Sequence, residues 1–215
     1  LGGEYNGKKV GSFDHTSLFS FHMAKQVSTV EGGCICTNDD AFADKIRLLR
    51  NQGMDLSGKK DINYNHVEFG LNFRITDIQA AIGSAQLKKI DKYLNKRLHF
   101  ATLYREGLQN CSFQEIPSYV TNHPNMFFGV IVSKDKRKDL IAYLNEHGVA
   151  TRVCWLPAHR QQFHKQFFSG DFPHADEIAD SIINLPMGNA NSEEDIHYVI
   201  KIFNQFFESK GGETV

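Results

Sequence analysis

Long apolar runs are missing from this sequence. No segment approaches the roughly 20 consecutive apolar residues that a helix needs to cross a bilayer. The first residues, Leu-Gly-Gly-Glu-Tyr, contain no basic stretch followed by an apolar one, so we expect no secretory signal. The formal net charge is only -1 and the pI is near 6.9, so no overall field points to nucleic acid or an anionic membrane. These absences predict a cytoplasmic protein with neither a membrane nor a nucleic acid as partner.

Cysteine is scarce, and its spacing excludes a disulfide framework. There are four cysteines, and they are scattered along the chain without the regular spacing of a small disulfide-rich domain: Cys34, Cys36, Cys111 and Cys154. A reducing cytoplasm fits this distribution best. The ten histidines show no metal-binding pattern either, because His159 and His164 lack a neighbouring Glu and a third ligand. We therefore expect no metal site.

What the sequence does contain is ordinary globular composition arranged as alternating strands and helices. It has 215 residues, of which 41% are hydrophobic and 23% charged, enough for one or two domains. Short apolar runs bounded by Gly or polar residues predict strands at 16–21, 32–37, 126–132 and 149–153. Helical spacing and capping signals predict helices that begin near Asp40, Asp77, Ile90, Asp135 and Ser192. Residues 53–69 are expected to form a long surface loop and 117–124 a linker.

One segment, Gly11 to Gly33, combines residues with chemical potential. Ser20 ends an expected strand, Lys25 follows five residues later in a polar loop, and a glycine pair precedes the next strand. The Ser20 hydroxyl could hold an anion such as a phosphate while the Lys25 amine forms an imine with a carbonyl and then moves a proton. On spacing alone, however, a lysine in a polar loop is more often solvated surface.

The sequence resembles the DegT/DnrJ/EryC1/StrS aminotransferases, pyridoxal-phosphate enzymes of fold type I that aminate nucleotide-linked keto-sugars. Their lysine motif runs roughly G-x-x-V-G-S-F, then a Phe-Ser-Phe strand, then Lys, then E-G-G. The matching elements here are Gly7 to Phe13, Phe19-Ser20-Phe21, Lys25 and Glu31-Gly32-Gly33. A second matching block covers 69–81, and a looser third comprises 155–159 and 185–187. The similarity spans essentially the whole chain, in the right order.

The resemblance implies an α/β fold. Residues 1–115 would form the later part of the fold-type-I large domain that binds the cofactor, and residues 125–215 a small C-terminal α+β domain. Lys25 matches the Schiff-base lysine, and Ser20 matches a hydroxyl that hydrogen-bonds the cofactor phosphate. The implied cofactor is pyridoxal 5′-phosphate.

Further residues take weaker roles from the same resemblance. Asn72 matches an Asn that reaches the cofactor phosphate in the neighbouring subunit's site, which implies a homodimer; otherwise Asn72 caps a turn. Arg74 either contacts substrate phosphates or braces its loop. Trp155 and His159 would line the sugar pocket. Alternatively, Trp155 only packs against neighbouring residues.

The activity implied is transfer of an amino group from an amino acid, by family analogy L-glutamate, to a nucleotide-linked keto-sugar used in cell-surface polysaccharides. In the family, an Asp that pairs with the pyridine nitrogen, the ring that stacks on the cofactor and part of the phosphate loop all precede the point that matches Leu1. The chain therefore resembles the C-terminal part of a longer enzyme whose N-terminal half lies in the same or a separate chain. Two alternatives remain, namely a sugar dehydrase relative, in which His replaces the lysine, and a non-catalytic or regulatory subunit that keeps the fold.

Overall fold

The computed structural model describes residues 1–55 and 65–209, and these divide into two compact units. Unit 1 comprises Leu1–Lys92 and Ser118–His123, and unit 2 comprises Tyr93–Pro117 and the chain from Pro124 onward. The expected loop at 53–69 falls partly outside the described residues, which omit 56–64. Among the helices that are described, none combines the length and apolar character needed to span a membrane.

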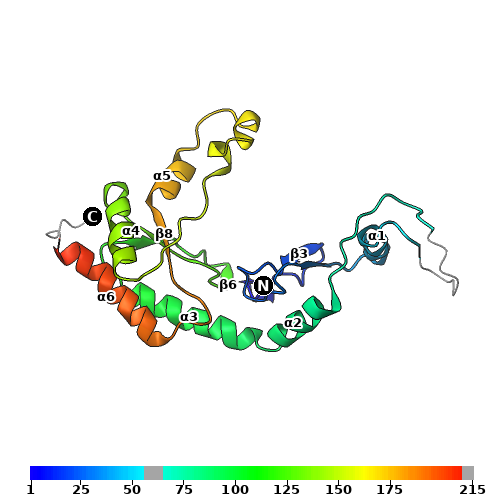
Figure 1. The fold of residues 1–215 in the computed structure, drawn as a ribbon, viewed down its shortest axis with the longest axis horizontal. Coiled ribbons are helices and arrows are strands. Elements are labelled where there is room, and N and C mark those ends of the chain that lie inside the picture. The colour runs from blue at the N-terminus through cyan, green and yellow to red at the C-terminus, as the bar shows by residue number, and fades with distance from the viewer. Residues whose placement is uncertain (56–64, 210–215) are drawn as a thin grey trace. The chain divides into compact units, whose positions relative to one another are not determined.

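Unit 1 contains short strands and two helices (Figure 1). Its elements in chain order are β1 (Glu4–Tyr5), β2 (Lys8–Lys9), β3 (Ser17–Ser20), β4 (Gly33–Cys36), α1 (Asp40–Arg50), α2 (Asp77–Leu87) and β6 (Val120–Asn122). The strands predicted at 16–21 and 32–37 are confirmed as β3 and β4. They pair directly and antiparallel, with Phe19 opposite Cys34 and Ser20 opposite Gly33. The loop that carries Lys25 is therefore the connection of a two-stranded hairpin.

The predicted starts of α1 and α2 are confirmed by their caps. Asp39 accepts a hydrogen bond from the Phe42 amide at 3.0 Å and so caps α1. At the start of α2, Thr76 and Gln79 form the complete capping box that the sequence signals. Ile78 of α2 is 75% exposed, and the one buried residue of the helix is Gly83. Helix α2 is therefore packed at Gly83 rather than through an apolar stripe.

The linker predicted at 117–124 is wrong, because part of it is a strand. β6 pairs antiparallel with β1, which in turn pairs with β2, to form a three-stranded sheet. Two side chains of β6 strengthen this pairing: Thr121 Oγ1 accepts from the Gly7 amide at 2.8 Å, and Asn122 Nδ2 donates to the Gly2 carbonyl at 3.1 Å. A polar three-residue strand at a sheet edge gives no apolar periodicity from which sequence could predict it.

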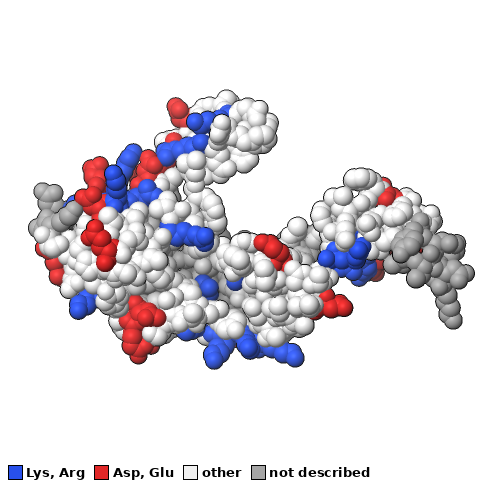
Figure 2. Space-filling model, in the orientation of Figure 1, with Lys and Arg blue, Asp and Glu red and all other residues white. Residues whose placement is uncertain are grey.

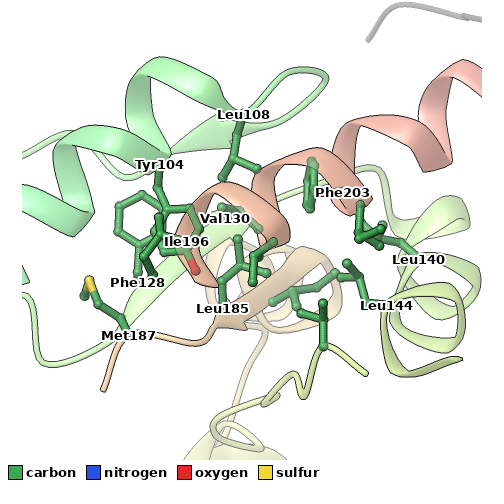
Figure 3. Close-up of a cluster of buried hydrophobic side chains, with 14 of the residues drawn as sticks. Tyr104, Leu108, Phe128, Val130, Leu140, Leu144, Leu185, Met187, Ile196 and Phe203 are labelled. Carbon is green, nitrogen blue, oxygen red and sulfur yellow. The ribbon is translucent and has the colours of Figure 1, made fainter. Parts of the chain in front are cut away.

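Unit 2 is built around an antiparallel sheet of the order β5–β7–β8. Its elements are most of α3 (Ile90–Gly107), then β5 (Ser112–Phe113), β7 (Phe128–Ile131), α4 (Lys134–Glu146), the 3-10 turns η1 (Ala158–Arg160) and η2 (His164–Phe167), α5 (Pro173–Ser181), β8 (Ile182–Leu185) and α6 (Glu193–Ser209). Figure 3 shows side chains from α3, the sheet, α4 and α6 converging on one apolar cluster, with Tyr104 stacked on Phe128. The buried face of α6 carries Ile196, Val199, Ile202, Phe203, Phe206 and Phe207. Burial of such aromatic and aliphatic side chains is the main stabilising term of this unit.

The strand predicted at 149–153, in unit 2, is wrong. Residues 149–153 form no strand, and only Arg152 makes a bridge, to Asn184. The strand that completes the sheet is β8, which pairs with β7 along its whole length and buries Ile183 fully. The predicted order strand, helix, strand, helix is therefore wrong, because α5 lies between α4 and the second strand, which comes about 30 residues later than expected.

The packing of α2 on the Lys25 loop leads to a stability prediction. A Cβ added at Gly83 would come within 2.8 Å of Thr29 Cγ2, and Thr29 is only 1% exposed. Gly83→Ala should therefore destabilise the protein by about 1–2 kcal/mol, because overpacking outweighs the roughly 1 kcal/mol that Ala gains over Gly in a helix. Chemical denaturation measures this change.

A second substitution reverses the expected sign. Thr29→Ser removes Cγ2 and keeps the hydroxyl, so in that background Gly83→Ala should raise the free energy of unfolding, by up to about 1 kcal/mol. If Gly83→Ala changes the free energy of unfolding equally in both backgrounds, the contact with Thr29 is not the cause of the change.

Candidate active site

The connection between β3 and β4, residues 21–32, is called the lysine loop below. Its two ends are joined by hydrogen bonds from the Phe21 amide to the Gly32 carbonyl at 2.8 Å and from the Thr29 amide to the Phe21 carbonyl at 2.9 Å. Gly32 has φ +146°, a backbone conformation that residues with a side chain rarely adopt, so glycine suits this end of the loop. These hydrogen bonds therefore hold the two ends of the loop together.

His22, at the start of this loop, forms hydrogen bonds with both Ser20 and the Lys25 backbone. The His22 amide donates to Ser20 Oγ at 3.3 Å, and the Lys25 amide donates to the His22 carbonyl at 2.9 Å. Across the loop, His22 Nε2 lies 3.8 Å from Glu31 Oε1. Ser20 and Lys25 therefore lie on one short turn that is hydrogen-bonded through its backbone.

Burial inside the lysine loop is uneven. Gln26, Val27 and Thr29 are buried, whereas Lys25 is half-buried and Ser20 is exposed.

Asn72 and Arg74 lie on a separate segment of unit 1, before α2. Both are exposed. Asn72 forms a β-bridge with Asn51, and Arg74 Nη1 donates to Asn51 Oδ1 at 2.8 Å. Asn51 is the C-cap of α1, so this hydrogen bond links the segment of Arg74 to the end of that helix.

A broad groove of about 1160 Å³ opens in unit 1. Its walls come from β3, β4, α1, α2 and the segment 69–75, and most of its lining is apolar, including Leu18, Ile35 and Phe73. Arg47, Arg50 and Arg74 also border it, whereas Ser20 and Lys25 do not. Phe21, Thr29, Glu31 and Gly32 of the lysine loop also line the groove, so it reaches this loop without bordering Ser20 or Lys25.

Trp155 and His159 belong to unit 2. Trp155 is 66% exposed and meets Phe127 edge-on, with ring centroids 5.5 Å apart. His159 is more enclosed, because its ring stacks on Phe172 at 4.7 Å and its Nε2 lies 2.8 Å from Asp176 Oδ1.

An ionic cluster fixes the segment around His159 to α5. Arg160 donates two hydrogen bonds to the Asp180 carboxylate, at 2.7 and 3.3 Å, and also pairs with Asp176, while Lys134 reaches Asp180 at 3.0 Å. The hydrogen bond from His159, and then Arg160, lower the pKa of Asp176. Arg160, and then Lys134, lower the pKa of Asp180.

Figure 2 shows acidic and basic side chains interspersed over the face in view, without a large patch of one sign.

Comparison with known proteins places these features in a family. The model of the DegT/DnrJ/EryC1/StrS aminotransferase family matches residues 1–204. The chain belongs to this family. Among its relatives, a UDP-4-amino-4,6-dideoxy-N-acetyl-beta-L-altrosamine transaminase of Helicobacter pylori is 33% identical over 96% of the chain and 57% of the relative. A pleiotropic regulatory protein of Geobacillus stearothermophilus is 32% identical over 96% of the chain and 56% of the relative.

Solved structures confirm the fold prediction. The chain superposes on the PLP-form of a putative sugar aminotransferase, Spr1654 from Streptococcus pneumoniae, with a TM-score of 0.88 and 23% identity, over 99% of this chain and 56% of that one. This member of the DegT/DnrJ/EryC1/StrS family therefore has the mixed α/β fold of the C-terminal portion of those enzymes, and it spans about half the length of the relatives it matches.

The structure adds residues around Lys25 that the sequence does not single out. Thr29, Gly83 and Gln86 all lie where α2 meets the lysine loop. Gln79, which the sequence marks only as part of a helix cap, also reaches this loop. No local sequence signal marks such contacts, because their partners are about 50 residues apart in the chain.

The ionic cluster predicts a pH-dependent stability. A carboxylate whose pKa is lower in the folded than in the unfolded state stabilises fully above the unfolded value, near 4, and loses this contribution as the pH falls through the folded value. Asp180→Asn should therefore lower the thermal midpoint at pH 7, and its difference from the parent should shrink below about pH 4.

Glu177→Gln is the matched control, because Glu177 lies on the same helix, is exposed, and is absent from the ion pairs of the described residues. A constant difference between Asp180→Asn and the parent from pH 7 to pH 3 would contradict the assigned role of Asp180.

Proposed function

We propose that this chain is the Schiff-base lysine portion of a pyridoxal-phosphate sugar aminotransferase. The observation that carries the proposal is the hydrogen-bonded turn that joins Ser20 to Lys25, in a chain that belongs to an aminotransferase family. In this proposal, Lys25 Nζ is the covalent attachment point of the cofactor and Ser20 Oγ donates to its phosphate. A primary amine and a hydroxyl on one turn are the donor types that an aldehyde-bearing phosphate ester requires.

The residues present fit pyridoxal phosphate in part. Lys25 is half-buried and Ser20 exposed, so the amine is partly shielded while the hydroxyl is open to a ligand. The bound cofactor supplies an electron sink for the carbanion formed at the amino acid. In this proposal, a carboxylate for its ring nitrogen would come from the upstream residues.

The proposed reaction moves nitrogen from an amino acid, L-glutamate by family analogy, to a nucleotide-linked keto-sugar. Lys25 Nζ would take a proton from the donor Cα and deliver it to C4′ of the cofactor, then act in reverse on the sugar. The H. pylori relative is named as a transaminase of an amino sugar linked to UDP, which supports this substrate class. A cytoplasmic place in the supply of cell-surface polysaccharide fits such a substrate.

We further propose that residues 1–115 are the later part of the large domain and 125–215 a small C-terminal domain. A complementary N-terminal half, in the same or a separate chain, would complete the large domain. Two observations support it: β3 and β4 form a sheet of only two strands, and Leu18 on that sheet is 75% exposed. Isolated two-stranded sheets are marginally stable, and open apolar faces favour association.

The remaining site residues take roles in the assembled enzyme. Asn72, which is exposed, would reach the cofactor phosphate in the neighbouring subunit of a homodimer. Arg74 would contact substrate phosphates after leaving Asn51. The exposed face of Trp155 and the ring of His159 would line the sugar pocket.

A second candidate is a regulatory protein that keeps this fold without catalysis. The observation that favours it is the relative from G. stearothermophilus, which is named a pleiotropic regulatory protein. Lys25 and Ser20 favour the enzyme, because regulation alone requires neither an imine-forming amine nor a phosphate donor. Visible absorbance of bound cofactor, fixed by borohydride onto Lys25, separates the two.

The first prediction from this proposal concerns Lys25. In the enzyme that contains this chain together with the upstream residues, Lys25→Arg should abolish both transamination and borohydride-trapped cofactor, because arginine stays protonated and forms no imine. Ser20→Ala is the matched comparison. It should keep turnover at saturating cofactor but weaken cofactor affinity about tenfold or more, as expected for a hydrogen bond to a charged group worth roughly 1.5–3 kcal/mol.

The two variants test different parts of the assignment. Turnover by Lys25→Arg at a tenth of the parent rate would remove Lys25 from the chemistry. Unchanged cofactor affinity in Ser20→Ala would leave Ser20 as a strand residue only.

The second prediction concerns the 215-residue chain by itself. It should bind pyridoxal phosphate weakly and show no transamination, because most of the proposed cofactor contacts lie upstream. Addition of a polypeptide that carries those upstream residues should restore both visible absorbance and activity. Robust turnover by the purified chain with no other polypeptide present would show that the essential residues lie within it.

A further inference from the structure

Helix α2 contacts the lysine loop at three positions. Gln79 Nε2 donates to the Glu31 carbonyl at 3.0 Å, and the Ser28 amide donates to Gln86 Oε1 at 3.1 Å. Between them, Gly83 lies so close to the loop that an added Cβ would come within 2.8 Å of Thr29 Cγ2. The helix thus touches the stretch of the loop that follows Lys25.

These three residues share one face of α2. Gln79, Gly83 and Gln86 are spaced by four and three residues, which places them in line along the helix. The face carries two amides and a glycine, while apolar side chains such as Ile78 point elsewhere and are exposed. Its contacts are therefore directional hydrogen bonds at close approach rather than apolar packing.

Gln79 links this face to the start of the helix. Its Oε1 accepts from the Thr76 amide at 3.0 Å in the capping box, while its Nε2 reaches the Glu31 carbonyl. One side chain therefore fixes both the first turn of α2 and the far end of the lysine loop. The segment that carries Asn72 and Arg74 runs directly into this turn, so it is tied to the loop through Gln79.

Gln86 supports the middle of the loop, next to its most buried residues. Val27 and Thr29, on either side of Ser28, are each 1% exposed. An amide in such a place must find an acceptor, because a buried donor without one loses its hydrogen bonds to water. Gln86 Oε1 supplies that acceptor from a residue 58 positions away in the chain.

We propose that Gln79 and Gln86 are positioning residues that set the conformation of the lysine loop and, through it, the placement of the Lys25 amine. The proposal rests on the function proposed above for Lys25. Both residues act through the loop backbone and touch no reacting atom. They hold the loop from one side by two hydrogen bonds, on either side of Thr29.

The variants that test this role keep the helix intact. Gln79→Glu retains an oxygen for the capping box and adds negative charge at the helix N-terminus, which the helix dipole favours, but it removes the donor to Glu31. Gln86→Leu removes the acceptor for the Ser28 amide, and Gln86→Glu restores it. Ser84→Ala, on an exposed part of α2, is the control for substitution of this helix.

The first measurement is hydrogen exchange of the 215-residue chain. Amides at 24–31 should exchange about three- to tenfold faster in Gln79→Glu and Gln86→Leu, as expected for loss of one hydrogen bond, and at the parent rate in Gln86→Glu and Ser84→Ala. Helical circular dichroism and the thermal midpoint should stay close to those of the control. Equal exchange of these amides in all variants overturns the proposal.

The second measurement reads the Lys25 amine itself. In the enzyme that includes the upstream residues, borohydride trapping of pyridoxal phosphate on Lys25 should be several-fold slower in Gln86→Leu and recover in Gln86→Glu. Unchanged trapping in both Gln79→Glu and Gln86→Leu overturns the positioning of Lys25. If the parent takes no label at Lys25 while exchange still responds to Gln86→Leu, the proposed function of Lys25 fails and the control of the loop by α2 stands.

Discussion

Apolar burial is confined almost entirely to unit 2, and the rest of the structure depends on this asymmetry. Apart from Val27, every buried apolar side chain of the described residues belongs to the single cluster formed by α3, β7, α4, β8, α6 and the segments beside them. Such a cluster fixes its elements by close packing, which tolerates little change in volume. The described residues of unit 1 contain no comparable cluster, so hydrogen bonds, caps and close backbone approaches determine their local geometry.

The lysine loop depends on such hydrogen bonds for its shape. A single hydrogen bond contributes only about 0.5–1.5 kcal/mol, but it fixes direction, which apolar contact does not. The loop is joined at its two ends, across its turn from Ser20 to Lys25, and along α2. Several weak directional contacts therefore define the backbone of the loop that carries Lys25.

How much could be predicted from sequence depends on the range of each interaction. The hairpin strands, the caps at Asp39 and Thr76, and the Ser20 to Lys25 turn depend on residues a few positions apart, and local patterns indicate them. β6 and β8 are missed or misplaced because a short strand is specified by its partner, here β1 for one and β7 for the other. The contact of Gln86 with Ser28 spans 58 residues and leaves no local pattern at all.

The same distinction separates the candidate site residues. Ser20 and Lys25 lie on one turn of the same hairpin, so the proposed pairing of their roles depends on local structure alone. Asn72 would reach the cofactor, and Trp155 and His159 the sugar, only through the arrangement of units, subunits and upstream residues. Unit 1 exposes Leu18, Phe69, Phe73 and Ile78, and apolar surface of this extent favours a covering partner. The relatives are nearly twice as long as the matched region, and the N-terminal half proposed above would cover this apolar surface and supply the remaining cofactor contacts.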